Sequence, residues 1–257
     1  MRNPSSRSPA VWRHAPWIVA VLLAGCGQKD GNGFLQEGQL IGGGTKQVSG
    51  ARPVGGFLPQ PSLLAPGSSG QADLVYINPS TQFASYNNVI IDPVAIWTTT
   101  DSSLSSTTPD QRKALANKAH ANLYNAIAKR CRMVQTASPG TLRMRFALVD
   151  AKATNATENT LATYTPYAST AYNLASLTFN NGVGYFAGTA TGEGYATDAR
   201  DGTLVWQAVD ERGGTTSLAE NTLNTWLDVD HAMQAWSEQV ADRLQQLGAC
   251  QRGHSRS

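Results

Sequence analysis

The sequence lacks an apolar run long enough to cross a bilayer, and it is poor in charged residues. Its apolar segment near the N-terminus, residues 17–24, is far shorter than the ~20 residues that a membrane-spanning helix needs. Charged residues make up 15 % of the chain, and the formal net charge is +2. Residues 1–25 contain three arginines and no acidic residue, so the remainder carries −1. Because phosphate backbones require concentrated Lys and Arg, we expect no nucleic-acid partner.

Motifs of the common hydrolases and redox enzymes are also missing. The sequence contains no His-Glu-x-x-His, Cys-x-x-Cys or Gly-x-Ser-x-Gly pattern. Asp228, Asp230 and His231 could form a metal site, but acidic residues at this point more simply stabilise the N-terminus of the last predicted helix. We therefore predict no catalytic residue, no metal and no cofactor.

Cysteine is scarce, and the first of the three cysteines marks an expected membrane anchor. It ends the tetrapeptide Leu23, Ala24, Gly25 and Cys26, which has the order of a bacterial lipobox. The preceding arginines and apolar core are typical of a secretory signal peptide. We predict that residues 1–25 are removed and that Cys26 carries fatty acyl chains such as palmitate; more than one chain gives firm anchoring. An ordinary signal peptide, in which Cys26 is incidental, is the alternative.

The residue after the expected lipid-bearing cysteine indicates which membrane receives the protein. Gly27 stands where Gram-negative lipoproteins that stay in the inner membrane carry Asp. We therefore predict a protein of the cell outer membrane whose domain faces the periplasm. Its expected partners are the membrane itself, through the N-terminal lipid, and an envelope protein.

Two cysteines, Cys131 and Cys250, remain after Cys26. Both lie just past the C-terminal ends of predicted helices. An even pair in an oxidising periplasm favours a disulfide. Two buried thiols are the alternative.

Composition divides the mature chain into a tether and a domain. Residues 27–70 hold twelve of the 24 glycines and four of the twelve prolines, which favours disorder because little apolar surface is available to offset ordering entropy. We predict a flexible tether over residues 26–70, in which the apolar islands 56–58 and 63–64 could dock on the folded body. A single domain over residues 71–250 and a polar tail over 251–257 complete the expected organisation.

Periodicity predicts an α+β domain. Strands are expected at residues 74–77, 88–97 and 141–150, a hairpin at 183–210 with its turn at 200–202, and a glycine-rich loop at 213–214. Helices are expected at residues 109–130, capped by Thr108, and at 229–247, capped by Asp228 and stopped by Gly248. Helices covering one face of a mostly antiparallel sheet give a two-layer sandwich.

One long segment fits neither helix nor strand periodicity. Residues 151–182 are rich in Thr, Ala and Asn, and long irregular segments inside domains are often functional. We predict that this segment and the hairpin tip form a partner surface. The residues expected on it are Tyr164, Tyr167, Tyr172, Arg200 and Asp201.

Short motifs spread over residues 56–247 resemble a known family. They are Gly56–Pro59 with Leu63 and Leu64, Tyr86 with Val89–Val94, Pro139–Arg145, Glu193 with Asp198 before Gly202, and Trp236 with Leu244. In this order they are similar to a bacterial lipoprotein family known only as domain of unknown function 3313. The resemblance implies a periplasm-facing outer-membrane lipoprotein and implies no reaction.

The leading functional prediction is a non-enzymatic binding or assembly accessory of the cell envelope. One alternative is a hydrolase that acts on envelope polymers. It would use two close carboxylates for acid–base chemistry, taken from the hairpin acids Glu193, Asp198, Asp201 and Asp210, or it would use His231. The other alternative is a carrier of a small apolar ligand, which predicts a pocket beneath the helices.

Overall fold

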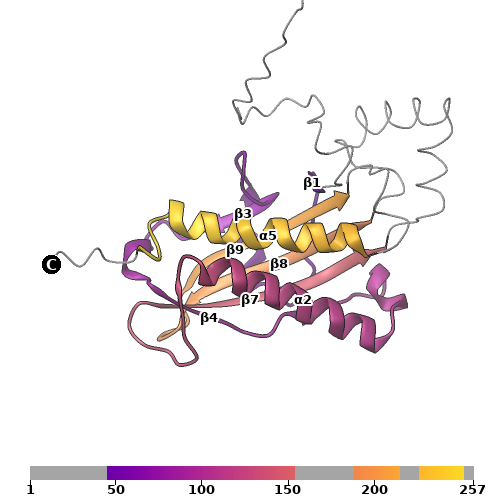
Figure 1. Cartoon of the computed structure of the whole chain (residues 1–257). Helices are drawn as coiled ribbons and strands as arrows, with labels where there is room; N and C mark the ends of the chain where they lie inside the picture. Colours follow the sequence, from indigo (N-terminus) through magenta and orange to yellow (C-terminus); the bar gives the residue numbers. More distant parts are fainter. Residues whose placement is uncertain (1–44, 154–187, 215–225, 252–257) are drawn as a thin grey trace, which may run out of the picture. The chain divides into compact units, whose positions relative to one another are not determined.

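The computed structural model describes residues 45–153, 188–214 and 226–251, which belong to one compact unit, Leu35–Ser257 (Figure 1). The strands are β1 (Thr45–Val48), β2 (Ala65–Pro66), β3 (Leu74–Ile77), β4 (Asn88–Ile91), β5 (Ala95–Ile96), β6 (Arg132–Met133), β7 (Thr141–Lys152), β8 (Thr189–Asp198) and β9 (Leu204–Gly214). The helices are α2 (Pro109–Ala128) and α5 (Leu227–Gln246), with short 3-10 turns η1 (Pro61–Leu63), η2 (Phe83–Ser85) and η3 (Ser103–Ser106).

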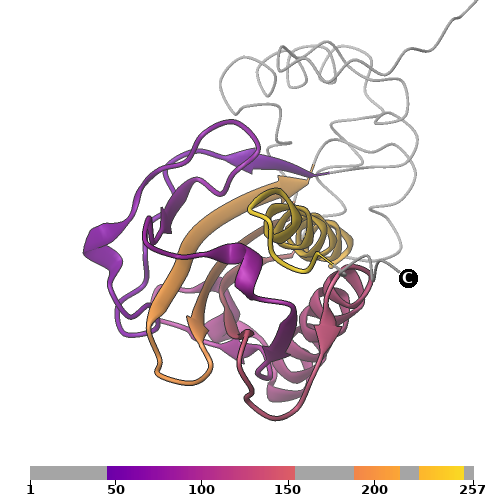
Figure 2. The same ribbon diagram turned by 90° about the vertical axis from the view of Figure 1, so that its left-hand side faces the viewer.

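The described strands form one nine-stranded sheet in the order β2-β3-β9-β8-β7-β4-β6, with β1 beside β9 and β5 beside β7. Its pairings are antiparallel, except that β4 runs parallel to β6 and β7, and β5 runs parallel to β7. Both long helices lie on one side of the sheet, and much of the purple N-terminal part lies on the other (Figure 2). The predicted α+β class, with two main helices on a mostly antiparallel sheet, is confirmed.

Helix α2 starts where the sequence predicts. The Thr108 side chain accepts a hydrogen bond from the Gln111 backbone, and the Gln111 side chain accepts one from the Thr108 backbone, which completes a capping box. The buried face has helical spacing and consists of Leu115, Ala119, Leu123, Ala126 and Ile127. The helix ends at Ala128 rather than at the expected residue 130.

Helix α5 ends as predicted but starts differently. Gly248 has a φ of 91°, its N–H donates to the Gln245 carbonyl at 3.0 Å, and the Ala249 N–H donates to the Leu244 carbonyl at 2.9 Å. These two bonds form a Schellman motif. The prediction that Asp228 caps the helix is wrong: Trp226 occupies the N-cap position, and Asp228 lies in the first turn. The Asp228 carboxylate instead accepts a hydrogen bond from the Gly188 N–H at 2.8 Å.

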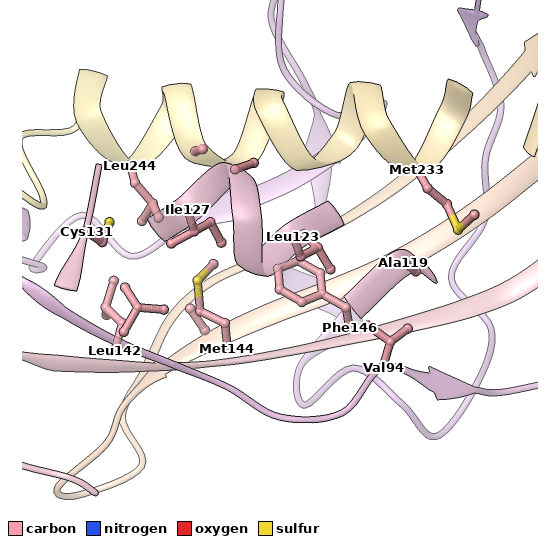
Figure 3. Close-up of a cluster of buried hydrophobic side chains, with 14 of the residues drawn as sticks. Val94, Ala119, Leu123, Ile127, Cys131, Leu142, Met144, Phe146, Met233 and Leu244 are labelled. Atoms are coloured by element: carbon pink, nitrogen blue, oxygen red, sulfur yellow. The ribbon is translucent and has the colours of Figure 1, made fainter. Parts of the chain in front are cut away.

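The main core lies between the two helices and the sheet (Figure 3). Strand β7 contributes its alternate residues Leu142, Met144, Phe146 and Leu148, each no more than 9 % exposed. Because side chains of a strand alternate between its two faces, this period places all four under the helices. The predicted half-buried strand is therefore confirmed, and it extends to Lys152.

The prediction of a flexible tether up to residue 70 is wrong from residue 45 onward. Strand β1 pairs with the C-terminal half of β9, from Thr45 opposite Gly214 to Val48 opposite Glu211. We call residues 51–64 the strap; its Ala51 and Leu58 are buried against Val209 on the sheet face away from the helices. Long-range strand pairing and a few apolar anchors therefore order a segment whose composition favours disorder.

The hairpin forms between β8 and β9, with Gly202 at a φ of 79° in the turn. The expected loop at 213–214 is wrong, because both glycines belong to β9 and pair with β1, and Gly213 also pairs with β8. The expected strand over residues 88–97 is divided into β4 and β5, with Pro93 between them. This division fits a residue that cannot donate to a ladder.

Candidate ligand-binding site

A cavity of about 90 Å³ lies between α5, α2 and the centre of the sheet. Its walls are mostly apolar, and Figure 3 shows five of the residues that line it: Val94, Ala119, Leu123, Phe146 and Met233. Two indole rings, from Trp206 on β9 and Trp236 on α5, complete the aromatic part of the lining. A partly enclosed apolar space with a few polar groups is the usual form of a small-ligand site.

Two glycines in the central strand β8 form the floor of the cavity. A Cβ atom on Gly194 would lie 2.6 Å from the Phe146 ring, and one on Gly192 would lie 3.2 Å from the Trp236 ring. Glycine inside a strand often marks a place where another group approaches the backbone closely. Here the aromatic rings of β7 and α5 approach bare backbone, which only glycine permits without displacing them.

Hydrogen bonds fix one side of the cavity. The Trp236 Nε1 donates to Asp210 Oδ2 at 2.8 Å, and Asp210 also accepts bonds from the Asp73 N–H at 2.9 Å, from Arg212 Nε at 3.0 Å and from Gln47 Nε2. Asp210 is 5 % exposed. A buried carboxylate requires such partners, because an unpaired buried charge is costly. The carboxylate thereby ties α5 to the edge of the sheet.

The cavity opens at the loop of residues 70–72. Gly70 is exposed, and Gln71 and Ala72 are half-buried. The Gln239 side chain on α5 donates to the Gly70 carbonyl at 3.0 Å and holds this loop against the helix. A second cavity of about 20 Å³ shares the lining residues Trp206, Val240 and Arg243 with the first.

Glu193 is buried on the opposite face of β8, beneath the strap, and is 2 % exposed. The Val54 N–H donates to Glu193 Oε1, and Oε2 has no hydrogen-bond partner among the described residues. Burial raises the pKa of Glu193 to about 7, and the Val54 hydrogen bond opposes this shift. The sequence predicted a hairpin acid here and apolar islands at 56–58 and 63–64 that could dock, and Leu58 does dock, but it did not predict that this segment covers Glu193.

The four hairpin acids proposed for acid–base chemistry do not form one group. Glu193 lies under the strap, whereas Asp210 faces α5, and Asp201 is exposed in the turn. Asp198 accepts a hydrogen bond from the Tyr86 hydroxyl at 2.9 Å. Burial and this bond raise the pKa of Tyr86 to about 12. Glu193 and Asp210 therefore lie on opposite faces of the sheet, whereas Asp198 and Asp201 both lie near the Tyr86 hydroxyl, and the charges of both contribute to its raised pKa.

Another acidic residue with a raised pKa is Glu211, which lies on β9 opposite Val48 of β1. Burial raises the pKa of Glu211, and the charges of Asp150, Asp73 and Asp210 raise it further. Asp73 accepts the N–H groups of Gly50 and Ala51, each at 2.8 Å. These two bonds hold the start of the strap beside β3.

The Asp-x-Asp-His pattern at the start of α5 does not converge. Asp230 forms a salt bridge with Lys118 on α2, while Asp228 bonds to Gly188. His231 is half-buried. Within residues 45–153, 188–214 and 226–251, no group of three or more His, Cys, Asp or Glu side chains could hold a metal ion.

The predicted partner surface is only partly described. Cys26, Tyr164, Tyr167 and Tyr172 lie outside the described residues. Arg200 and Asp201 are exposed at the hairpin turn, where the Thr203 N–H donates to Asp201 Oδ1 at 2.8 Å and lowers the pKa of that carboxyl.

The sequence did not indicate an exposed arginine–aromatic surface on the strap side. Arg143 Nε and Arg145 Nε both donate to Asp92, at 2.9 and 2.7 Å. Burial acts to raise the pKa of Asp92, but the bonds from the two arginines outweigh it and hold this pKa below its usual value. Arg145 lies 5.7 Å from the centre of the Tyr195 ring, which packs on Phe57 of the strap.

The two cysteines that remain after Cys26 form a disulfide. Cys131, just after α2, is bonded to Cys250, just after α5, with 4.7 Å between their Cα atoms. The bridge therefore joins the C-terminal ends of the two helices. Both residues are buried in the main core.

The chain belongs to the family described as protein of unknown function (DUF3313), whose model matches residues 55–240. The match begins within the strap and ends within α5, so it includes every strand from β2 to β9. No curated protein matches the chain.

The similar solved structures are remote. A PelC dodecamer from Paraburkholderia phytofirmans is 14 % identical, with a TM-score of 0.34, over 69 % of this chain and 96 % of its own. A DUF4136 family protein from Bacteroides thetaiotaomicron VPI-5482 is 10 % identical over the same shares, with a TM-score of 0.30. A Caulobacter crescentus CB15 protein provisionally described as a lipoprotein is 9 % identical over 65 % of this chain and 90 % of its own, with a TM-score of 0.28. At these values the similarities carry no argument about function.

Neither α2 nor α5, the long helices of the described part, is apolar enough to cross a membrane.

Proposed function

We propose that this protein is a lipoprotein of the cell outer membrane, anchored through Cys26, whose domain faces the periplasm and acts as a non-enzymatic binding or assembly accessory. The observation that carries the proposal is the use of its three cysteines. Cys131 and Cys250 are consumed by a disulfide, which leaves Cys26, the cysteine that ends the lipobox, for the lipid. Disulfides persist in oxidising compartments such as the periplasm.

The non-enzymatic role is supported by the positions of the candidate catalytic groups. The hairpin carboxylates face different sides of the sheet, and the side chains at the start of α5 bond to Gly188 and Lys118. The folded domain instead offers a cavity and exposed surfaces. A binding role requires only such a cavity or an exposed surface.

Replacement of Cys26 tests the anchor. In cells fed an alkyne analogue of palmitate, the wild-type protein is expected to be labelled and to fractionate with the outer membrane. Cys26→Ser is expected to lose the label and to appear in the soluble periplasmic fraction. The Cys131→Ser/Cys250→Ser protein is the control and keeps the label. A Cys26→Ser protein that stays labelled in the outer membrane would refute the proposal.

Crosslinking in intact cells tests the accessory role. A photoreactive residue at the exposed positions 200 or 201 is expected to capture one specific envelope partner, whereas the same residue at exposed position 121 on α2 is the control. Capture of no partner at the hairpin tip, with the protein correctly anchored, would contradict a partner surface there.

A carrier of a small apolar ligand is a second candidate, and the cavity beneath α5 favours it. A fully packed interface between α5 and the sheet would have left this role without a site. The two roles are compatible, because an anchored accessory can bind a ligand without chemistry.

A further inference from the structure

We infer that the cavity beneath α5 binds a small apolar group, about the size of one six-membered ring, that carries a single anionic oxygen substituent directed to Arg243. This ligand class is narrower than the binding role proposed above, on which it rests. The size, the lining and the one unused polar donor each contribute to it.

The volume sets the size of the occupant. The cavity measures about 90 Å³, and the adjoining space adds about 20 Å³. One water needs about 10–15 Å³, and an engineered apolar cavity of about 150 Å³ in another protein accepts benzene. The two spaces together are smaller than that cavity, so a ring fits only when its substituent lies outside them, in the part open to solvent, and a whole fatty acyl chain is excluded.

The lining sets the polarity of the occupant. Phe146, Trp206 and Trp236 supply three aromatic rings, and Leu123 and Met233 supply aliphatic and thioether surface. A water molecule in such a space would lack the two to four polar partners that hold buried water. Aromatic rings prefer other rings at their faces and edges, so a planar apolar group gains most.

Arg243 sets the charge of the occupant. The lining contains three charged residues: Glu193, Asp210 and Arg243. The Glu193 carboxylate bonds to the strap on the other face, and Asp210 already accepts four hydrogen bonds. Arg243 differs, because its Nη1 donates to Gln246 Oε1 at 3.0 Å while its buried Nε has no partner among the described residues. A guanidinium with an unused donor favours a carboxylate or similar oxyanion.

Entry would occur at the loop of residues 70–72. This loop contains Gly70, the exposed residue of the lining, and the Gln239 side chain joins it to α5 by a hydrogen bond to the Gly70 carbonyl. The Gln47 side chain also holds this loop, by donating to the Gln71 carbonyl at 3.0 Å, so widening the opening breaks these two side-chain bonds without moving α5. A ligand that enters here meets the half-buried side chains of Gln239 and Arg243 before it reaches the aromatic rings.

Three ring compounds of similar size but different charge test the inference: benzoate, benzyl alcohol and benzylammonium. The full chain carrying Cys26→Ser, purified without detergent, is titrated with each while unfolding is followed by calorimetry and binding by tryptophan fluorescence. Benzoate is expected to bind saturably, about tenfold more tightly than benzyl alcohol, and benzylammonium more weakly than either. At ten times its dissociation constant, benzoate should raise Tm by about 3 °C or more.

Substitutions in and outside the cavity lining show whether benzoate binds in the cavity. Ala119→Leu and Ala208→Val each add side-chain volume inside the cavity and are expected to abolish the benzoate shift, with folding verified by circular dichroism. Ala121→Leu makes the same change as Ala119→Leu on the exposed face of α2 and should leave the shift unchanged. Arg243→Gln should retain binding of benzyl alcohol but lose the tenfold preference for benzoate.

Two results would overturn the inference. The first is the absence of a saturable benzoate shift, or a shift that persists when the cavity is filled by either variant. The second is an equal affinity for benzoate and benzyl alcohol, or a preference that Arg243→Gln retains. Neither result concerns anchoring, because the protein used lacks Cys26, so failure here is distinguishable from failure of the proposed lipoprotein.

Discussion

Trp236 on α5 donates its indole proton to the buried carboxylate of Asp210 on β9, at 2.8 Å. The same ring lies against the position where a Cβ of Gly192 would be. A single side chain thus connects the helix layer to the sheet edge and covers part of the cavity. Because Asp210 also bonds to Gln47 of β1 and to the Asp73 backbone next to β3, the contact links α5 to the two strands that pair with β9 on the side away from β8.

Removing this hydrogen bond should destabilise the fold measurably. Trp236→Phe keeps a ring but deletes the donor, and is expected to lower the free energy of unfolding by about 1–3 kcal/mol, as for hydrogen bonds to charged groups. Urea denaturation of Trp236→Phe, Asp210→Asn and the double variant gives the coupling energy. A coupling below about 0.5 kcal/mol would mean that the two residues act independently.

The floor of the cavity should not tolerate a methyl group. Gly194→Ala places a Cβ 2.6 Å from the Phe146 ring and 3.3 Å from the Trp206 ring. Overpacking of this kind costs about 1–3 kcal/mol, and urea denaturation should show the loss. Gly55→Ala is the matched control, since its Cβ would have no heavy atom within 4 Å. Equal stability of the two variants would contradict the close approach of Phe146 to β8.

Glu193 should make stability depend on pH. Its pKa is raised from 4.5 to about 7 by burial, so the folded state holds a proton that the unfolded state releases. The stabilisation is fully present below about pH 4.5 and is lost as the pH rises through about 7. Between pH 5 and pH 8, wild type should therefore lose roughly 2–3 kcal/mol relative to Glu193→Gln.

The pH dependence of the free energy of unfolding in two variants separates the effect of Glu193 from that of other carboxylates. Glu238 on α5 has its pKa lowered, with the Lys129 hydrogen bond as the largest cause, so it titrates below this window. Glu238→Gln should therefore keep the wild-type slope between pH 5 and pH 8. A Glu193→Gln protein with that same slope would show that Glu193 is ionised beneath the strap.

Loss of the disulfide should cost about 2–5 kcal/mol. The bridge joins residues separated by 119 positions, and closing so long a loop restricts the unfolded chain strongly. The Cys131→Ser/Cys250→Ser protein and the reduced wild type should show the same lowered free energy of unfolding in urea. Identical stability of the oxidised and reduced wild type would rule out a stabilising role for this bridge.

The strap shows where sequence interpretation failed. Its glycines and prolines favour disorder locally. The apolar island 56–58 was expected as a possible docking point, and Leu58 does pack on Val209, but nothing in the sequence indicated the order of the rest of the segment or the burial of Ala51. The order of this segment comes from β9, which lies far away in the sequence. The burial of Glu193 was missed for the same reason, because the group that covers it is the strap.

The cavity could not be predicted from the sequence either. Its residues come from both helices and from five of the strands or their adjoining loops, and none of them forms a local motif. Gly192 and Gly194 were the one available sign, since two glycines spaced by one residue in a central strand leave its helix-facing side bare. The acidic start of α5 gave a misleading sign, because Asp228 and Asp230 bond to distant groups rather than capping the helix.

The features that depend on neighbours along the chain follow from the sequence alone. These are the capping box and buried stripe of α2, the alternation of β7, the hairpin turn at Gly202 and the glycine stop of α5, because hydrogen bonding and periodicity within a few residues specify each of them. Three features depend on the packing of distant segments: the face of the sheet that each acid occupies, the position of the strap, and the space that remains beneath α5. Each of these features is set by side chains from segments far apart in the sequence. No single segment therefore specifies which side chains come into contact or how much space they leave.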